Sequence, residues 1–254
     1  MAKASIKSPR EIELMRECCR IVAEVLRILK KCIQAGVTTR ELDAMAEEYI
    51  LSRKGEPAFK GYGADPKNRF PASLCTSVED EVVHGIPGSR MLREGEIVSL
   101  DVGVKKGGFY GDGAWTFPVG RISDEKSLLL KSAEESLYTG IAQARAGNRV
   151  HDISAAVQSH VERDGFSVVR DLVGHGVGRE LHEEPAIPNY GQRGTGPVLE
   201  KGMTLAIEPM VNLGKYQVRV DDDGWTIRTA DGFPSAHFEH TILVTDGEPE
   251  ILTQ

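Results

Sequence analysis

The segment SLDVGVKKGGFYGDGAWTF, residues 99–117, has the pattern of a β-hairpin in which each arm carries one aspartate. Val102 and Val104 alternate with small or charged residues in the first arm, and a Lys-Lys-Gly-Gly turn precedes the second arm. β-Strands disfavour aspartate, and a half-buried carboxylate needs a partner for its charge. We therefore expect the hairpin to hold Asp101 and Asp112 in register, facing a common partner.

The elements predicted around this hairpin follow an order that repeats along the chain. Ser8-Pro9-Arg10-Glu11 has the form of a capping box with proline at the first helical position, and it predicts a helix that ends near Gly36. Apolar periodicity and turn residues predict the other elements, which are helices over 38–52, 123–144 and 150–163, a loop over 59–73, and strands over 73–78, 96–104, 109–119, 204–207, 225–229 and 238–245.

Two segments 111 positions apart resemble each other, which indicates a duplication. AGVTTRELDAMAEEYI begins at residue 35 and AGNRVHDISAAVQSHV at residue 146, and they share Ala-Gly, an acidic residue, Leu or Ile, and Ala at the same offsets. Helix turns often share residues, so coincidence remains an alternative on the pattern alone. We predict an α+β protein with helices on a curved, mostly antiparallel sheet, forming a single domain over 1–254 with halves at about 8–120 and 121–250.

Composition limits the classes of partner. The net charge is −7, from 31 basic and 38 acidic residues, which argues against nucleic acid or an anionic membrane as the main partner. The first residues do not have the basic-then-apolar pattern of a leader, so we expect none, and no apolar run approaches the ~18 residues of a membrane span. The four cysteines lack CxxC or zinc-ribbon spacing, so we expect reduced thiols and a cytoplasmic protein.

Three further side chains of the second half fit poorly into buried strands. His175 lies between two glycines, Glu208 ends an apolar run before a proline, and Glu239 lies inside another apolar run. A single strand carboxylate is usually exposed or paired with a cationic side chain. Four buried carboxylates with one imidazole would repel one another unless a cation held them. This hard, oxygen-rich set suits two divalent ions about 3.5–4 Å apart that share bridging carboxylates.

The motifs together resemble type I methionine aminopeptidases over nearly the whole chain. They are SVEDEVVHGIP, LDVG, GDGAWTF, GHGVGRELHEEP, IEPM and FEHT, in that order. The resemblance implies the duplicated pita-bread fold and two divalent metal ions per chain, with Co, Fe, Mn, Ni and Zn all compatible with the ligand set. It implies that Asp101, Asp112, His175, Glu208 and Glu239 are the metal ligands, with Asp112 and Glu239 as the bridges.

The resemblance also implies the reaction and the substrate. A metal-bridging hydroxide would attack the first peptide bond and remove the initiator methionine from nascent polypeptides whose second residue is small. Glu208 would accept the proton, His182 would stabilise the tetrahedral intermediate, and His84 would position the substrate backbone. The free amine would bind near Asp101. His182 is expected in a loop at the mouth of the cleft.

Several other residues match pocket positions of the family less specifically. Tyr62 and Trp225 match pocket-lining aromatics, and Cys75 matches a position near the methionine pocket; Phe59, Phe70 and Leu181 are looser candidates. Plain core packing is the alternative for each of them. The remaining histidines, His151, His160, His237 and His240, match no functional position, and we expect them to be structural. Glu79 replaces an asparagine that many relatives use at a monovalent-cation site, so that site stays undecided although Ser235 matches another of its positions.

Two rival functions remain from the sequence. One is a proline-directed peptidase of the same fold, whose relatives usually carry an additional N-terminal domain. The other is a catalytically inactive module that binds protein or RNA; such modules lose ligands, whereas all five are present here. We expect a monomer that acts on the N-termini of nascent chains, with transient ribosome association compatible with that role.

Overall fold

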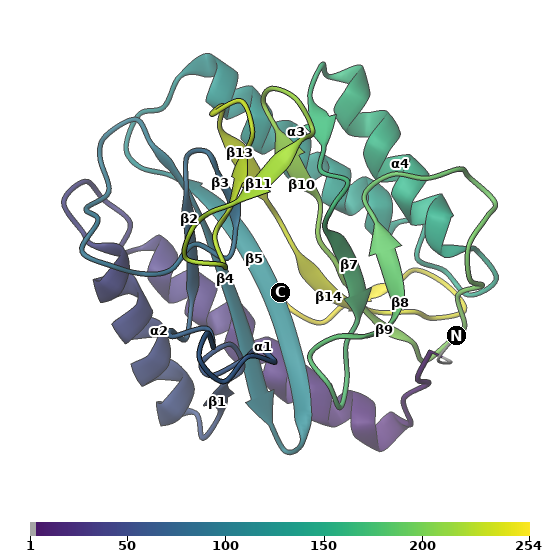
Figure 1. Ribbon diagram of the computed structural model, residues 1–254. Coiled ribbons are helices and arrows are strands. Elements are labelled where there is room, and N and C mark those ends of the chain that lie inside the picture. The colour runs from purple at the N-terminus through teal and green to yellow at the C-terminus, as the bar shows by residue number, and fades with distance from the viewer. Residues whose placement is uncertain (1–3) are drawn as a thin grey trace.

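The hairpin predicted from residues 99–117 forms the centre of the first half in the computed structural model, which describes residues 4–254 (Figure 1). Strands β4 (Ile97–Lys106) and β5 (Phe109–Pro118) pair antiparallel along their whole length. Asp101 lies opposite Ala114 and Asp112 lies opposite Gly103, so the aspartates are diagonal neighbours on one face rather than in direct register. β2 (Cys75–Val78) and β1 (Glu56–Pro57) pair with the outer edge of β4.

The opposite face of the hairpin is covered by α1 (Pro9–Lys30), which the capping box of Ser8 and Glu11 begins as predicted. Val102 and Val104 point to this face and join the core formed with α1 and α2 (Thr39–Ser52). Gly111, on the same face of β5, lets the helix come close, since a Cβ there would lie 2.8 Å from the backbone nitrogen of Cys19. The alternation of the hairpin thus separates carboxylates on one face from helix packing on the other.

The second half repeats the helix pair with α3 (Asp124–Ile141) and α4 (Val150–Arg163) (Figure 1). The segments recognised as a repeat have equivalent backbone features. Gly36 has φ +94° and Gly147 has φ +92°, a left-handed conformation that favours glycine. Glu41 and Asp152, three residues after the N-caps of α2 and α4, each accept a hydrogen bond from the N-cap backbone. The shared residues are therefore those that begin each second helix.

The strands of the second half form several small sheets, and one sheet joins the halves. Five strands have the order β15-β14-β9-β7-β8, three have the order β13-β10-β6, and β11-β12-β3 combines strands of both halves. All of their pairings are antiparallel, which confirms the predicted α+β class. Their bounds are β3 Glu81–Val83, β6 Ser167–Val168, β7 Val173–Gly176, β8 Glu183–Pro188, β9 Thr204–Ile207, β10 Met210–Asn212, β11 Val218–Val220, β12 Ile227–Thr229, β13 Ser235–His237, β14 His240–Leu243 and β15 Glu250–Ile251.

The central strand β5 also connects the halves by hydrogen bonds to the segment 237–241. The backbone N–H of Glu239 donates to the carbonyl of Ala114 at 2.9 Å, and the hydroxyl of Thr241 donates to the carbonyl of Asp112 at 2.7 Å. The hydroxyl of Thr116 donates to the carbonyl of His237 at 2.8 Å. These contacts bring Glu239 beside the aspartates of the hairpin.

Several predicted boundaries are wrong. α1 ends at Lys30 rather than near Gly36, and α3 ends at Ile141 rather than at residue 144, in both cases before irregular turns. Glu239 was expected inside a strand, but it lies in the break between β13 and β14. The segment after His182 is the strand β8 rather than a loop, because it pairs with β7.

None of the helices within residues 4–254 has the length and hydrophobicity that a membrane span requires.

We predict that Gly111→Ala destabilises the protein. The added methyl group would collide with helix backbone, which has no rotamer to relieve the contact, and overpacking of this kind costs about 1–3 kcal/mol. Chemical denaturation of the variant measures the free energy of unfolding. Gly88→Ala is the control, because a Cβ there meets no atom within 4 Å. An equal loss of stability in the two variants would refute the proposed close contact between α1 and β5.

Candidate metal centre and substrate pocket

One pocket is lined by every side chain that the sequence predicts for the site. Its lining comes from both halves of the chain and consists of Phe59, Tyr62, Phe70, Cys75, His84, Asp101, Asp112, His175, Leu181, His182, Glu208, Trp225 and Glu239. The structure therefore places the predicted ligand, catalytic and pocket residues together. Their individual roles remain predictions.

The ligand-type side chains of the second half come from strand ends and breaks. His175 lies on β7, and Glu208 and Glu239 each lie between two strands. Pro209 explains the break after Glu208, because proline has no N–H to donate to a ladder and β9 ends at Ile207. At such a break a carboxylate can leave the plane of the sheet and point toward the hairpin.

Three of the predicted ligands, one from the hairpin and two from the second half, meet closely enough to share one metal ion. Ligand atoms of Asp112, His175 and Glu239 all lie within 4.8 Å of one another, and all three residues are buried. Glu208 adjoins the group, with its Oε1 3.6 Å from the Nε2 of His175. Oδ1 of Asp101 and Oε1 of Glu239 are buried without a hydrogen-bond partner among residues 4–254. Unpartnered carboxylate oxygens in this position fit a cation as the missing partner.

The electrostatics of the carboxylates agree with that fit. Burial raises the pKa of Asp101 to about 7, well above that of an aspartate in water. Burial and the charges of neighbouring carboxylates also hold the pKa values of Asp112 and Glu239 well above their usual range. Without a cation these groups cannot all be ionised at neutral pH. The donor set therefore suits divalent ions, and its oxygens and single imidazole nitrogen resemble a hydrolytic centre rather than a thiolate zinc site.

His175 is prepared to bind through Nε2. Its Nδ1 lies 2.9 Å from the carbonyl oxygen of Gly176, which can only accept, so Nδ1 carries the proton and Nε2 presents its lone pair to the carboxylates.

Glu208 differs from the other acids of the pocket. Burial raises the pKa of Glu208, but the adjacent imidazoles of His237 and His175 together bring the pKa below its usual value.

Two further imidazoles face the pocket from outside this group. The His182 ring packs edge-on against the His175 ring with centroids 4.3 Å apart, and Nδ1 of His182 lies 2.6 Å from the hydroxyl of Tyr62. Partial burial of the ring and the adjacent His175 lower the pKa of His182 to about 4. Burial also lowers the pKa of His84. Both rings are therefore neutral hydrogen-bonding groups at pH 7 rather than fixed charges.

Aromatic side chains form the apolar part of the pocket. The Phe70 ring packs edge-on against Trp225 with centroids 5.3 Å apart, and Phe59 packs edge-on against Phe70 at 6.5 Å. Cys75 and Leu181 belong to the same apolar cluster, each 3% exposed. Tyr62 is 41% exposed and forms part of the rim. These groups make an apolar slot next to the carboxylates.

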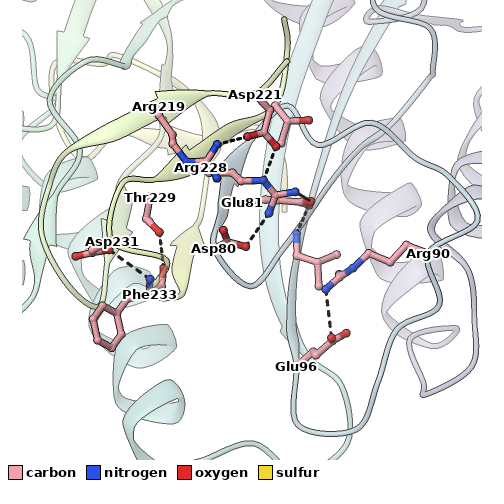
Figure 2. A network of polar contacts seen from close by, with 12 residues as sticks. Asp80, Glu81, Arg90, Glu96, Arg219, Asp221, Arg228, Thr229, Asp231 and Phe233 are labelled. Carbon is pink, nitrogen blue, oxygen red and sulfur yellow. Dashed lines mark hydrogen bonds and ion pairs between the residues drawn. The ribbon is translucent and has the colours of Figure 1, made fainter. Parts of the chain in front are cut away.

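An arginine-centred network supports the wall that carries His84 and Trp225 (Figure 2). The guanidinium of Arg228 on β12 donates to Asp80 and to Glu81, both at 2.7 Å, and also to Asp221. Arg228 lies opposite Glu81 across the pairing of β12 with β3, and His84 follows β3 directly. The His84 and Trp225 rings meet edge-on, 6.4 Å between centroids. The network therefore joins the two segments that position these rings.

Sequence reasoning missed one histidine of this region. We expected His237 to be structural, but its Nε2 lies 3.4 Å from Oε2 of Glu208. No local sequence pattern indicates this contact, since the two residues are far apart along the chain. His151, His160 and His240 lie outside the pocket lining, in accord with a structural role. Glu79 forms an ion pair with Lys126 at 2.7 Å.

Known metallopeptidases resemble the chain over nearly its whole length. The model of metallopeptidase family M24 matches residues 13–246. The chain is 52% identical to methionine aminopeptidase 1 of Bacillus subtilis over 248 residues, 98% of each chain. It is 44% identical to methionine aminopeptidase of Escherichia coli over 251 residues, 98% of this chain and 93% of the relative.

Solved structures confirm the pita-bread fold. Methionine aminopeptidase from Thermotoga maritima matches with a TM-score of 0.96 and 47% identity, over 99% of this chain and 100% of that chain. Prolidase from Pyrococcus furiosus shares the fold alone, with a TM-score of 0.78 and 22% identity over 98% of this chain and 65% of that chain. The chain belongs to the methionine aminopeptidases of metallopeptidase family M24.

Proposed function

We propose that the chain removes the N-terminal methionine from nascent polypeptides whose second residue is small, by metal-dependent hydrolysis of the first peptide bond. The observation that carries this proposal is the position of the apolar slot. Phe70, Trp225 and Cys75 line the same pocket as the buried carboxylates and His175. A flexible thioether side chain suits such a slot, and its peptide bond would then lie beside the ligand group.

The ligand set supports two divalent cations. Asp112 and Glu239 would lie between them, His175 and Glu208 would hold one, and Asp101 would hold the other. Oxygen and imidazole ligands of this kind accept Mn, Fe, Co, Ni or Zn, so metal supply decides the identity. When bound, such cations lower the pKa of a water molecule and polarise a substrate carbonyl.

The protein's own side chains would orient the substrate and transfer the protons. Glu208 would accept the proton of the attacking water and return it to the leaving amine. The Tyr62 hydroxyl can donate to Nδ1 of His182, which leaves the proton of that ring on Nε2. His182 would then donate from Nε2 to the developing oxyanion, and its neutral state makes it a hydrogen-bond donor at pH 7. His84 would position the substrate backbone, and Asp101 the free amine.

The setting of this activity is also part of the proposal. Residues 1–254 would act as a single catalytic domain of two halves, about 8–120 and 121–250. The domain would work in the cytoplasm as a monomer, on N-termini that emerge from ribosomes with which it associates transiently. The net charge of −7 supports a peptide rather than a nucleic acid as the substrate.

A peptide panel tests the function. Protein stripped of metal and reconstituted with each divalent ion in turn should cleave Met-Ala-Ser. It should show little activity on Val-Ala-Ser, because a β-branched residue fits the slot poorly, or on Ala-Pro-Ser. Product amino acids released per minute give kcat/KM for each peptide. Preferred cleavage of Ala-Pro-Ser would favour the proline-directed rival, and no cleavage with any ion would favour the inactive module.

Two histidine variants separate metal ligation from substrate contact. His175→Ala should weaken metal binding, and added metal should restore part of the activity on Met-Ala-Ser. His182→Ala should keep its metal but lose kcat by about 10²–10³-fold, as expected for loss of an oxyanion donor, and excess metal should not rescue it. Metal content and kcat are measured on both variants across a metal titration. If His182→Ala loses metal while His175→Ala retains it, the two roles are reversed.

A further inference from the structure

His237 is a buried imidazole that lies beside Glu208. It is 1% exposed, and neither ring nitrogen makes a conventional hydrogen bond within residues 4–254. Its Nε2 lies 3.4 Å from Oε2 of Glu208. His237 does not line the pocket, so the ring lies behind Glu208 as seen from the substrate side. Such a ring is placed to act on the reaction through Glu208.

The backbone of His237 is held by hydrogen bonds to Thr116 and by strand pairing. Its N–H donates to the hydroxyl of Thr116 at 2.9 Å, and its carbonyl accepts from the same hydroxyl at 2.8 Å. Within the sheet His237 lies opposite Met210, two residues beyond Glu208, which makes Glu208 and His237 near-diagonal neighbours across β10 and β13. The ring is therefore aimed by a rigid support rather than by a loop.

The proton of the ring belongs on the nitrogen that faces Glu208. A neutral imidazole has one donor and one acceptor nitrogen, and a carboxylate can only accept. A buried N–H without a partner is rarer than an unpartnered acceptor. The proton is therefore placed on Nε2, since this tautomer leaves only the acceptor Nδ1 without a hydrogen-bond partner. In metal-free proteins, hydrogen bonds of a catalytic group are often long and shorten when the complex forms.

We propose that His237 is a positioning residue that donates a hydrogen bond from Nε2 to Oε2 of Glu208 and thereby fixes the orientation of that carboxylate. Oε1 of Glu208 faces His175 at 3.6 Å, while Oε2 faces His237 at 3.4 Å. One oxygen is thus directed toward the ligand group, and the other is held from behind. This role rests on the proposed function of Glu208 as the proton acceptor, and it adds a residue that holds that acceptor in place.

Variants that keep or remove the donor test the proposal. His237→Leu removes it, and kcat on Met-Ala-Ser should fall by about 10–100-fold at saturating metal, the usual effect of losing such a support, with KM changed little. His237→Gln keeps an N–H donor at similar reach and should restore kcat to within a few-fold of the unmodified protein. His240→Leu is the matched control, because His240 is also buried but contacts Tyr138 and Thr253 instead.

A second readout does not depend on activity. Crystal structures of the metal-free variants should show Glu208 in its original rotamer in His237→Gln and turned in His237→Leu. Equal kcat and an unchanged rotamer in His237→Leu would overturn the proposal, as would equal losses of kcat in the Leu and Gln variants. Loss of a bound metal in both variants would instead make His237 a ligand and would also overturn it. If the unmodified protein cleaves no peptide, the proposed function fails, and the rotamers still decide the role of His237.

Discussion

Four carboxylates facing one pocket impose the constraint on which the rest of this structure depends. Asp101, Asp112 and Glu239 have raised pKa values because burial and mutual repulsion disfavour their charges. A fold that keeps such groups together must hold them against that repulsion with rigid elements, and cation binding stabilises the folded state. The constraint explains both why the ligand-type residues come from strands and the short breaks between them and why a divalent metal suits the site.

The fold meets this constraint because one face of the hairpin packs against a helix and the other face lines the pocket. On one face Gly111 lets α1 pack directly against β5, and on the other face Asp112 points into the pocket. Hydrogen bonds from Thr116 and Thr241 then fasten β5 to the segment that carries Glu239. The substrate wall is held separately, by the Arg228 network across β3 and β12. Ligands and apolar slot are thus supported by different contacts around one cavity.

Local patterns predicted the parts of this arrangement that depend on neighbouring residues. The hairpin, the capped helices and the repeat follow from alternation, from caps and from two glycines with positive φ. The five ligand-type residues could be recognised because charged groups interrupt apolar strand patterns. Strands of two or three residues, such as β6 and β10, were missed because pairing with distant strands creates them. His237 could not be assigned because its contact with Glu208 depends on the pairing of β13 with β10, the strand that follows Glu208.

Proton release on metal binding tests the central claim most directly, that buried and repelling carboxylates are the metal site. Titration calorimetry of the metal-free protein with Mn²⁺ at pH 7, in two buffers of different ionisation enthalpy, gives the number of protons displaced. Since the raised pKa values favour the protonated forms of these carboxylates, metal binding at pH 7 should release protons. The number should rise as the pH is lowered toward 6 and fall as the pH is raised above the pKa of Asp101, about 7. Stoichiometric binding with no proton release at any of these pH values would contradict the account.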